Sequence, residues 1–183
     1  MPLSPPVTRQ HLHTRKYLFE GFEREDGLFD IEGRITDTKT YGFTNEYRGR
    51  IGPDEAIHDM QIRLTLDIDM KIHGVEVCTN SSPYRICGNV APSYAALIGE
   101  QIKAGWTRRV KALVGGTKGC THVTEMLSSM GTVAFQTMWP VWDKRRKEDP
   151  EARPGILNTC HALDTDREVV KRFHPKFYTG SDA

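Results

Sequence analysis

The most reactive combination of side chains falls in residues 119–125, which read GCTHVTE. If a helix begins at Thr121, His122 and Glu125 lie three residues apart on one face, within reach of a common point. Cys120 then sits just before the helix, where the helix dipole favours a thiolate. We expect His122 to act as an acid, a base or a metal ligand, with Glu125 as its partner and Cys120 as a ligand or orienter. The alternative is a capped helix that exposes both side chains without any chemistry.

A second group, Cys160 and His161, stands in the run NTCH at residues 158–161. Adjacent side chains oppose each other in an extended strand, so these two do not readily bind one metal ion together. One of them could still join a site built around His122. The alternative is a buried cysteine beside a surface histidine.

His58 and Asp59 form a third group, immediately before the clearest strand pattern of the chain. A histidine beside a carboxylate is a candidate acid or base, although sequence neighbours need not contact each other. We include both residues in the predicted catalytic set. The alternative is a polar pair that merely begins a strand.

The fourth group combines His13 and Arg15 with Asp37 and Lys39. Arg15 or Lys39 could hold the anionic end of a substrate, while Asp37 could pair with either of them. Ordinary ion pairing at the surface is the alternative. All four groups fall at the boundaries of predicted elements, where sites carried by a scaffold tend to be built.

Alternating apolar residues predict four strands in the first half of the chain, near residues 15–25, 29–36, 62–68 and 70–77. The first two are joined by an Asp-Gly turn at Gly27, which makes a hairpin. Gly74 shifts the alternation of the last strand as a β-bulge would. Residues 40–57, rich in glycine and polar side chains, are expected to be irregular.

The period changes to about 3.6 after Pro92, which predicts helices over residues 93–102, 106–114 and 121–139. We therefore predict an α+β fold: an antiparallel β-meander of about four to five strands, then three or so helices packed on one face. Residues 1–183 are expected to form one domain. Within it, residues 1–12 form an extended arm and residues 140–183 are largely irregular.

Composition narrows the class of protein. The chain has 183 residues, of which 38% are hydrophobic and 27% charged, with a formal net charge of +1. These values exclude a largely disordered chain and give no electrostatic footprint for nucleic acid. We expect no membrane-spanning segment and no signal peptide, and therefore a cytoplasmic protein whose four cysteines are free. No motif for an organic cofactor is present.

Nine segments, taken in order, resemble a bacterial family catalogued as Domain of Unknown Function 2889. They are residues 13–15, 27–33, 37–39, 58–60, 83–87, 119–122, 134–137, 158–161 and 178–180. The resemblance spans nearly the whole chain and implies small-molecule enzymology, in the catabolism of aromatic, steroid or acyl compounds. From residue 59 onward the element order also resembles that of iron–sulfur scaffold proteins, although their Gly-Cys-Gly-Cys-like stretch is missing.

Together these observations favour a catabolic enzyme that performs lyase-type acid–base or metal-assisted chemistry on an aromatic or carboxylated small molecule. The predicted catalytic residues are His122, Glu125, His58, Asp59 and His161; the predicted substrate-binding residues are Arg15, Lys39, His13 and Tyr84; and the predicted metal ligands are Cys120, His122 and Cys160. A divalent metal is the expected cofactor if there is one, and a homodimer is plausible from the N-terminal arm. The alternatives are a metal, thiol or iron–sulfur carrier without turnover, and a regulatory or interaction module.

Overall fold

The computed structural model describes residues 2–148 and 153–181. It divides into two compact units, residues 1–138 and residues 139–183, which we describe separately. Residues 1, 149–152 and 182–183 lie outside the described residues. Parts of the predicted N-terminal arm and of the predicted irregular C-terminal region fall on them.

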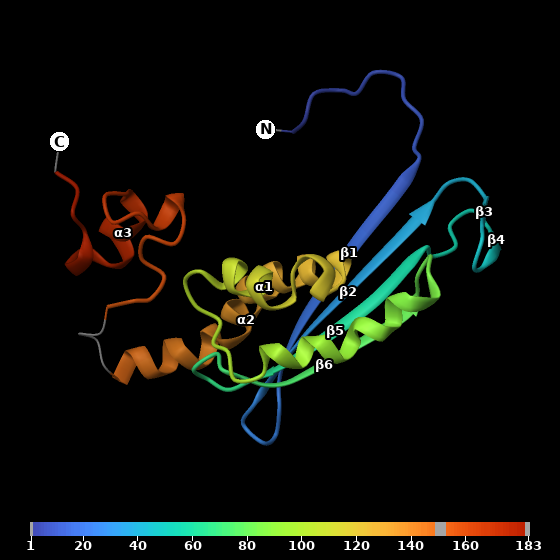
Figure 1. Cartoon of the computed structure of the whole chain (residues 1–183). Helices are drawn as coiled ribbons and strands as arrows, with labels where there is room; N and C mark the ends of the chain where they lie inside the picture. The colour runs from blue at the N-terminus through green and yellow to red at the C-terminus, as the bar shows by residue number, and fades with distance from the viewer. Residues whose placement is uncertain (1, 149–152, 182–183) are drawn as a thin grey trace. The chain divides into compact units, whose positions relative to one another are not determined.

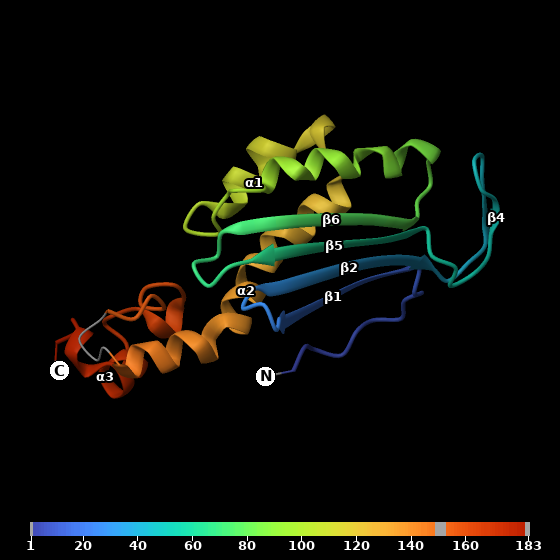
Figure 2. The same cartoon turned by 90° about the horizontal axis from the view of Figure 1, so that it is seen from below.

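The first unit is built on a four-stranded antiparallel sheet with the strand order β1-β2-β5-β6 (Figures 1 and 2). Its strands are β1 (His13–Glu23), β2 (Phe29–Lys39), β5 (His58–Leu66) and β6 (Ile72–Ser81). Gly27 adopts φ 80° in the turn between β1 and β2, a conformation that glycine reaches without steric cost. The predicted hairpin and the predicted α+β class are confirmed.

The register of the sheet aligns three polar residues from three strands. Arg15 on β1 is opposite Asp37 on β2, and Asp37 is in turn opposite His58 on β5. The pairing of β5 with β6 shifts where Gly74 follows the unpaired His73, which is the predicted bulge. Because directly opposed residues share a face of a sheet, the register brings the three side chains together.

A small hairpin interrupts the region 40–57 that the sequence predicts to be irregular. It consists of β3 (Phe43–Asn45) and β4 (Gly49–Ile51). The Asn45 side chain accepts hydrogen bonds of 3.0 Å from the backbone N–H groups two and three residues later, which closes the turn. The expectation for these residues is therefore corrected: local turn chemistry builds regular structure that apolar alternation did not show.

One face of the sheet forms the core of the first unit together with the long helix α2 (Thr121–Glu148). A methyl group at Gly33 of β2 would lie 3.3 Å from the Met130 sulfur, and one at Gly21 of β1 would overlap the side chain of Thr137. The first part of α2 therefore crosses β1 and β2 on this inner face, as Figure 2 also shows. The buried helix residues are Val123, Met126, Leu127, Met130, Ala134 and Met138.

Two further helices complete the layer that covers the inner face, η1 (Arg85–Leu97), of the 3-10 type, and α1 (Trp106–Val114). The Trp106 indole donates a 2.7 Å hydrogen bond to a backbone carbonyl of α2, which joins α1 to α2. The helix predicted over residues 93–102 is wrong in its extent. At Gly99 the backbone takes φ 87° and pairs with the start of β6 instead of continuing a helix.

Helix α2 continues beyond its expected end. It runs through Pro140 to Glu148. A proline inside a helix removes one intrahelical hydrogen bond, but the helix can continue past it. The remaining short elements are η2 (Gly116–Lys118) in the first unit and η3 (His161–Leu163), α3 (Glu168–Phe173) and η4 (Pro175–Phe177) in the second. At the other end, residues 2–12 form neither helix nor strand and are all exposed.

Candidate functional site

Asp37 is the centre of the best-developed polar cluster in the first unit. Its side chain is 2% exposed, on the inner face of β2. Oδ1 accepts hydrogen bonds from His13 Nε2 at 2.9 Å and Arg15 Nε at 2.8 Å. Oδ2 accepts from Arg15 Nη2 at 2.9 Å and His58 Nδ1 at 3.0 Å. Four donors thus hold one buried carboxylate, which fixes its orientation.

His122, in the first turn of α2, packs against His58. The two ring centroids are 3.8 Å apart and the ring planes make an angle of 32°. His122 Nε2 also lies 3.8 Å from Asp37 Oδ2. We call these three residues the Asp37–His58–His122 cluster. It joins β2, β5 and α2, which are far apart in the sequence.

Tyr94 positions the start of α2 and therefore His122. Its fully buried hydroxyl accepts a 2.9 Å hydrogen bond from the backbone N–H of Cys120 and lies 3.1 Å from the Thr124 hydroxyl. Unpaired N–H groups at a helix start need such an acceptor when they are buried. The Cys120 sulfur then lies 3.7 Å from His122 Nδ1 and 3.6 Å from the Met60 sulfur.

Glu125, one turn further along α2, contacts the cluster through β1. Its Oε2 atom accepts hydrogen bonds from Tyr17 at 2.9 Å and from Arg15 Nη1 at 3.2 Å. The Arg15 guanidinium is therefore shared between Asp37 and Glu125. Glu125 supports Arg15, whereas the sequence predicted that it would partner His122.

The charges of the cluster follow from this geometry. Burial alone would raise the pKa of Asp37, but hydrogen bonds from Arg15 and His13 outweigh it and lower that pKa to about 2. Burial, and then the nearby His122 ring, lowers the pKa of His58. Burial, and then the positive charge of Arg15, lowers the pKa of His122. At neutral pH the cluster therefore contains one carboxylate and two uncharged imidazoles.

Such an arrangement has two chemical capabilities. One ligand atom from each of Asp37, His58 and His122 lies within 4.8 Å of the others, a spacing that can hold a metal ion. A carboxylate that orients a neutral imidazole is also the usual arrangement for general acid–base catalysis.

Three predicted site residues lie away from the cluster. Asp59 points to the opposite face of the sheet, because neighbours on a strand alternate, and Arg34 binds it through two nitrogens at 2.8 and 2.7 Å. The Lys39 ammonium lies 5.2 Å from the centre of the Tyr41 ring. Tyr84 is exposed and packs edge-on against another tyrosine ring. Among the described contacts, none connects these side chains to the cluster.

The predicted residues Cys160 and His161 belong to the second unit. Both are exposed, and both line a shallow hollow with four neighbouring residues. Their assignment as metal ligand and catalytic residue stays a prediction.

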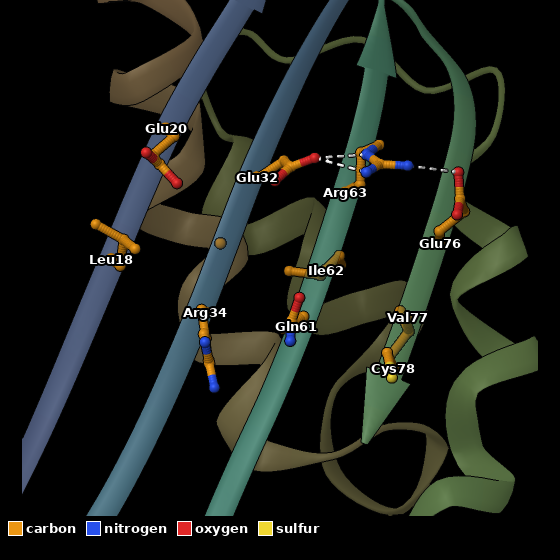
Figure 3. A pocket seen from close by; sticks show the side chains of 11 residues that line it. Leu18, Glu20, Glu32, Arg34, Gln61, Ile62, Arg63, Glu76, Val77 and Cys78 are labelled. Carbon is orange, nitrogen blue, oxygen red and sulfur yellow. Dashed lines mark hydrogen bonds and ion pairs between the residues drawn. The ribbon is translucent and has the colours of Figure 1, made fainter. Parts of the chain in front are cut away.

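The outer face of the sheet carries a different feature, an open pocket of about 260 Å³ (Figure 3). The Arg63 side chain, on β5, lies in this pocket. It donates hydrogen bonds to Glu32 on β2 at 2.7 Å and to Glu76 on β6 at 3.3 Å, so the guanidinium pairs with a carboxylate on each neighbouring strand. Cys78 also lines the pocket, and its thiol donates a hydrogen bond of 3.2 Å to Asn80 Oδ1. We interpret this face as a ladder of ion pairs that keeps a solvent-facing sheet polar.

Sequence reasoning found most members of the inner-face cluster but not its centre. It assigned Asp37 only as a partner of Arg15 or Lys39, and it omitted Tyr17 and Tyr94. A signal for the pair Arg15 and Asp37 was present in the sequence. Both residues lie eleven positions from Asp26 in the hairpin turn, which places them opposite each other on β1 and β2.

Comparisons with known proteins give one match. A family model described as "Protein of unknown function (DUF2889)" matches residues 13–136. No curated protein and no solved structure matches the chain, which leaves the likeness to iron–sulfur scaffold proteins without support. Within the described residues, no helix has both the length and the apolar character needed to cross a membrane.

Proposed function

The chain belongs to the DUF2889 family, and we propose that it is an enzyme that performs lyase-type acid–base chemistry on a small aromatic or carboxylated molecule. The reacting groups would be His58 and His122, with Asp37 holding His58 in place. Residues 13–136, which the family model matches, contain all three.

The observation that carries this proposal is the hydrogen bond between His58 Nδ1 and the buried Asp37. When Nδ1–H donates a hydrogen bond to the carboxylate, the lone pair of the neutral ring is left on Nε2. That nitrogen can take a proton from a substrate, and the carboxylate stabilises the imidazolium that forms.

His122 supplies the second proton-transfer group. Its ring centre is 3.8 Å from that of His58, so one substrate could contact both rings. Lyase reactions require a base to remove one proton and an acid to protonate the leaving group, which two histidines can divide between them. Both side chains remain about one-fifth exposed, so a small molecule has access to them.

The test is a screen of the purified full chain against a panel of aromatic acids and other carboxylated compounds, with products detected by mass spectrometry. For any compound that is converted, we expect His58→Gln and His122→Gln each to reduce turnover by at least about a hundredfold. His73→Gln is the matched control, because His73 also bonds to a carboxylate, at 2.7 Å from Asp67, but on the exposed surface. Full turnover in both cluster variants would show the assignment to be wrong.

A second candidate is a metal carrier without turnover. The observation that favours it is the set of three ligand atoms within 4.8 Å of one another. A protein that binds a metal ion through the cluster, passes it to a chelator or partner and converts no compound of the panel would favour the carrier.

A further inference from the structure

The spacing of the cluster has a second consequence, which concerns the same three residues as the proposed function and goes beyond it. Four-coordinate zinc holds nitrogen and oxygen ligands at about 2.1 Å, which places neighbouring ligand atoms about 3.4 Å apart. The two separations measured from Asp37 Oδ2 lie either side of that value: 3.0 Å to His58 Nδ1 and 3.8 Å to His122 Nε2. We propose that the Asp37–His58–His122 cluster binds a divalent first-row transition metal ion such as zinc. The ion would take the place of the proton on His58 Nδ1 and would use the lone pair of His122 Nε2. Both rings therefore act as ligands in the metal-bound chain, and the proton transfer proposed for them belongs to the metal-free chain.

The donor set selects the class of ion. Two imidazole nitrogens and one carboxylate oxygen suit zinc, cobalt, nickel or iron, whereas magnesium and calcium prefer oxygen ligands alone. Three protein ligands leave at least one coordination position for water or for a substrate carboxylate. An ion at this position would offer an anionic ligand a place to bind, whereas Arg15, one of the two residues that the sequence analysis assigned to that role, is already held by Asp37 and Glu125.

The surroundings of Asp37 suit a ligand that must hold its orientation. His13 and Arg15 both donate to Oδ1, and Arg15 also donates to Oδ2 through Nη2 at 2.9 Å, so the carboxylate is held at both oxygens while Oδ2 faces the two histidines. Ligating carboxylates in metal sites are commonly fixed by such hydrogen bonds, and losing them weakens metal binding. Glu125 offsets the charge that Arg15 would otherwise direct toward a cation.

Cys120 lies outside the proposed ligand set. Its sulfur is 3.7 Å from Nδ1 of His122, whereas the proposed ligand atom of that ring is Nε2, on the side of Asp37. The proposal thus separates Cys120 from the ion, although the sequence analysis named it as a ligand.

The test is a titration of chelator-treated full chain with Zn²⁺, and with Co²⁺ for its visible spectrum. We expect one ion per chain, and affinity at least about tenfold weaker in His58→Gln and in His122→Gln. Two variants should bind as the wild type does: His73→Gln, the exposed histidine control, and Cys120→Ser. The cobalt spectrum should show no thiolate-to-metal band.

Several results would overturn the inference. One is the absence of stoichiometric binding at millimolar ion, and another is binding that neither cluster variant weakens. A thiolate band that Cys120→Ser removes would move the ion to the other side of His122. The proposed enzyme fails separately: binding without turnover of any compound refutes the enzyme and leaves the metal site, whereas turnover without cluster-dependent binding refutes only the metal site. Circular dichroism of each variant confirms that it is folded.

Discussion

At the scale of single residues, the burial of Asp37 decides how the candidate site is organised. A carboxylate that loses its water must recover the lost hydrogen bonds from the protein, and here it recovers four from His13, Arg15 and His58. The same bonds that make the buried charge tolerable also fix the three side chains. Stability and site geometry therefore depend on one residue.

Replacing Asp37 with Asn should be costly for this reason. The amide has one acceptor oxygen and presents N–H groups to a guanidinium, so at least one buried donor is left without a partner. We expect the free energy of unfolding in urea to fall by about 2–4 kcal/mol. Glu76→Gln is the control, because its ion pair lies at a side chain that is 75% exposed, and it should change stability by about 0.5 kcal/mol or less. Equal effects of the two substitutions would contradict the central role of Asp37.

Asp59 allows a test of pH dependence away from the candidate site. The hydrogen bonds from Arg34 lower the pKa of Asp59 below its usual value of 3.8, against the opposing effect of burial. A carboxyl whose pKa is lowered by folding stabilises the protein above its unfolded pKa and loses that contribution as the pH falls through its folded pKa. We expect Asp59→Asn to be about 1 kcal/mol less stable than the wild type at pH 7.

The difference between the two proteins should close as the pH falls through the folded pKa of Asp59, below 3.8. Urea denaturation of both proteins at a series of pH values measures it. A gap that stays constant down to the acid end of the series would mean that the ion pair with Arg34 does not account for it.

At the scale of elements, the start of α2 is a feature that the sequence predicted well, and the extent of η1 is one that it did not. The sequence predicted a start at Thr121 because a glycine-rich run precedes a sustained 3.6-residue period there, and α2 does begin at Thr121. The helix expected over residues 93–102 ends at Leu97, because Gly99 takes a left-handed conformation and the chain joins β6. Apolar spacing alone could not reveal that tertiary pairing.

Tyr94 should therefore control the stability of the helix start. Tyr94→Phe keeps the buried ring but removes the acceptor for the Cys120 backbone N–H. We expect a loss of about 1–2 kcal/mol in the free energy of unfolding, since a buried donor is left unpaired. We also expect the amide resonances of residues 120–124 to shift in an NMR spectrum. Unchanged stability and unchanged resonances would show that the helix start is held by other contacts.

A second prediction at this scale concerns the contact between α2 and β1 at Gly21. Gly21→Ala places a methyl group where the Thr137 side chain lies, so we expect a loss of about 1–3 kcal/mol from overpacking. Thr137→Ala in the same chain should restore part of that loss, because it removes the overlapping atoms. Gly88→Ala is the control, since nothing lies within 4 Å of a methyl group there. Denaturation of the single and double variants would show additive effects if the two sites were not in contact.

At the scale of the whole molecule, the order β1-β2-β5-β6 follows the predicted antiparallel meander, but the sequence did not supply the register in which β5 pairs with β2. Each pair in the candidate site had a local signal, such as the hairpin turn that sets Arg15 opposite Asp37. The third member, His58, reaches the Asp37 carboxylate because β5 pairs with β2, although β3 and β4 lie between these two strands in the sequence. Side chains alternate between the two faces of β5, so His58 and Asp59 point to opposite faces although they are neighbours in the sequence.

The last prediction concerns residues 160 and 161, which lie outside the range matched by the family model and in the second unit. Among the described residues, the hydrogen bonds that hold the cluster in place come from residues 13–125, within both the matched range and the first unit. We therefore expect Cys160→Ser and His161→Gln, in the second unit, to change zinc affinity and turnover by less than about threefold, because the proposed ligands and the described groups that hold them all belong to the first unit. Parallel titrations of these variants and of His122→Gln measure the difference. A loss of tenfold or more at residue 160 or 161 would instead place the second unit in the site, since exposed side chains with no part in binding have no means of weakening it.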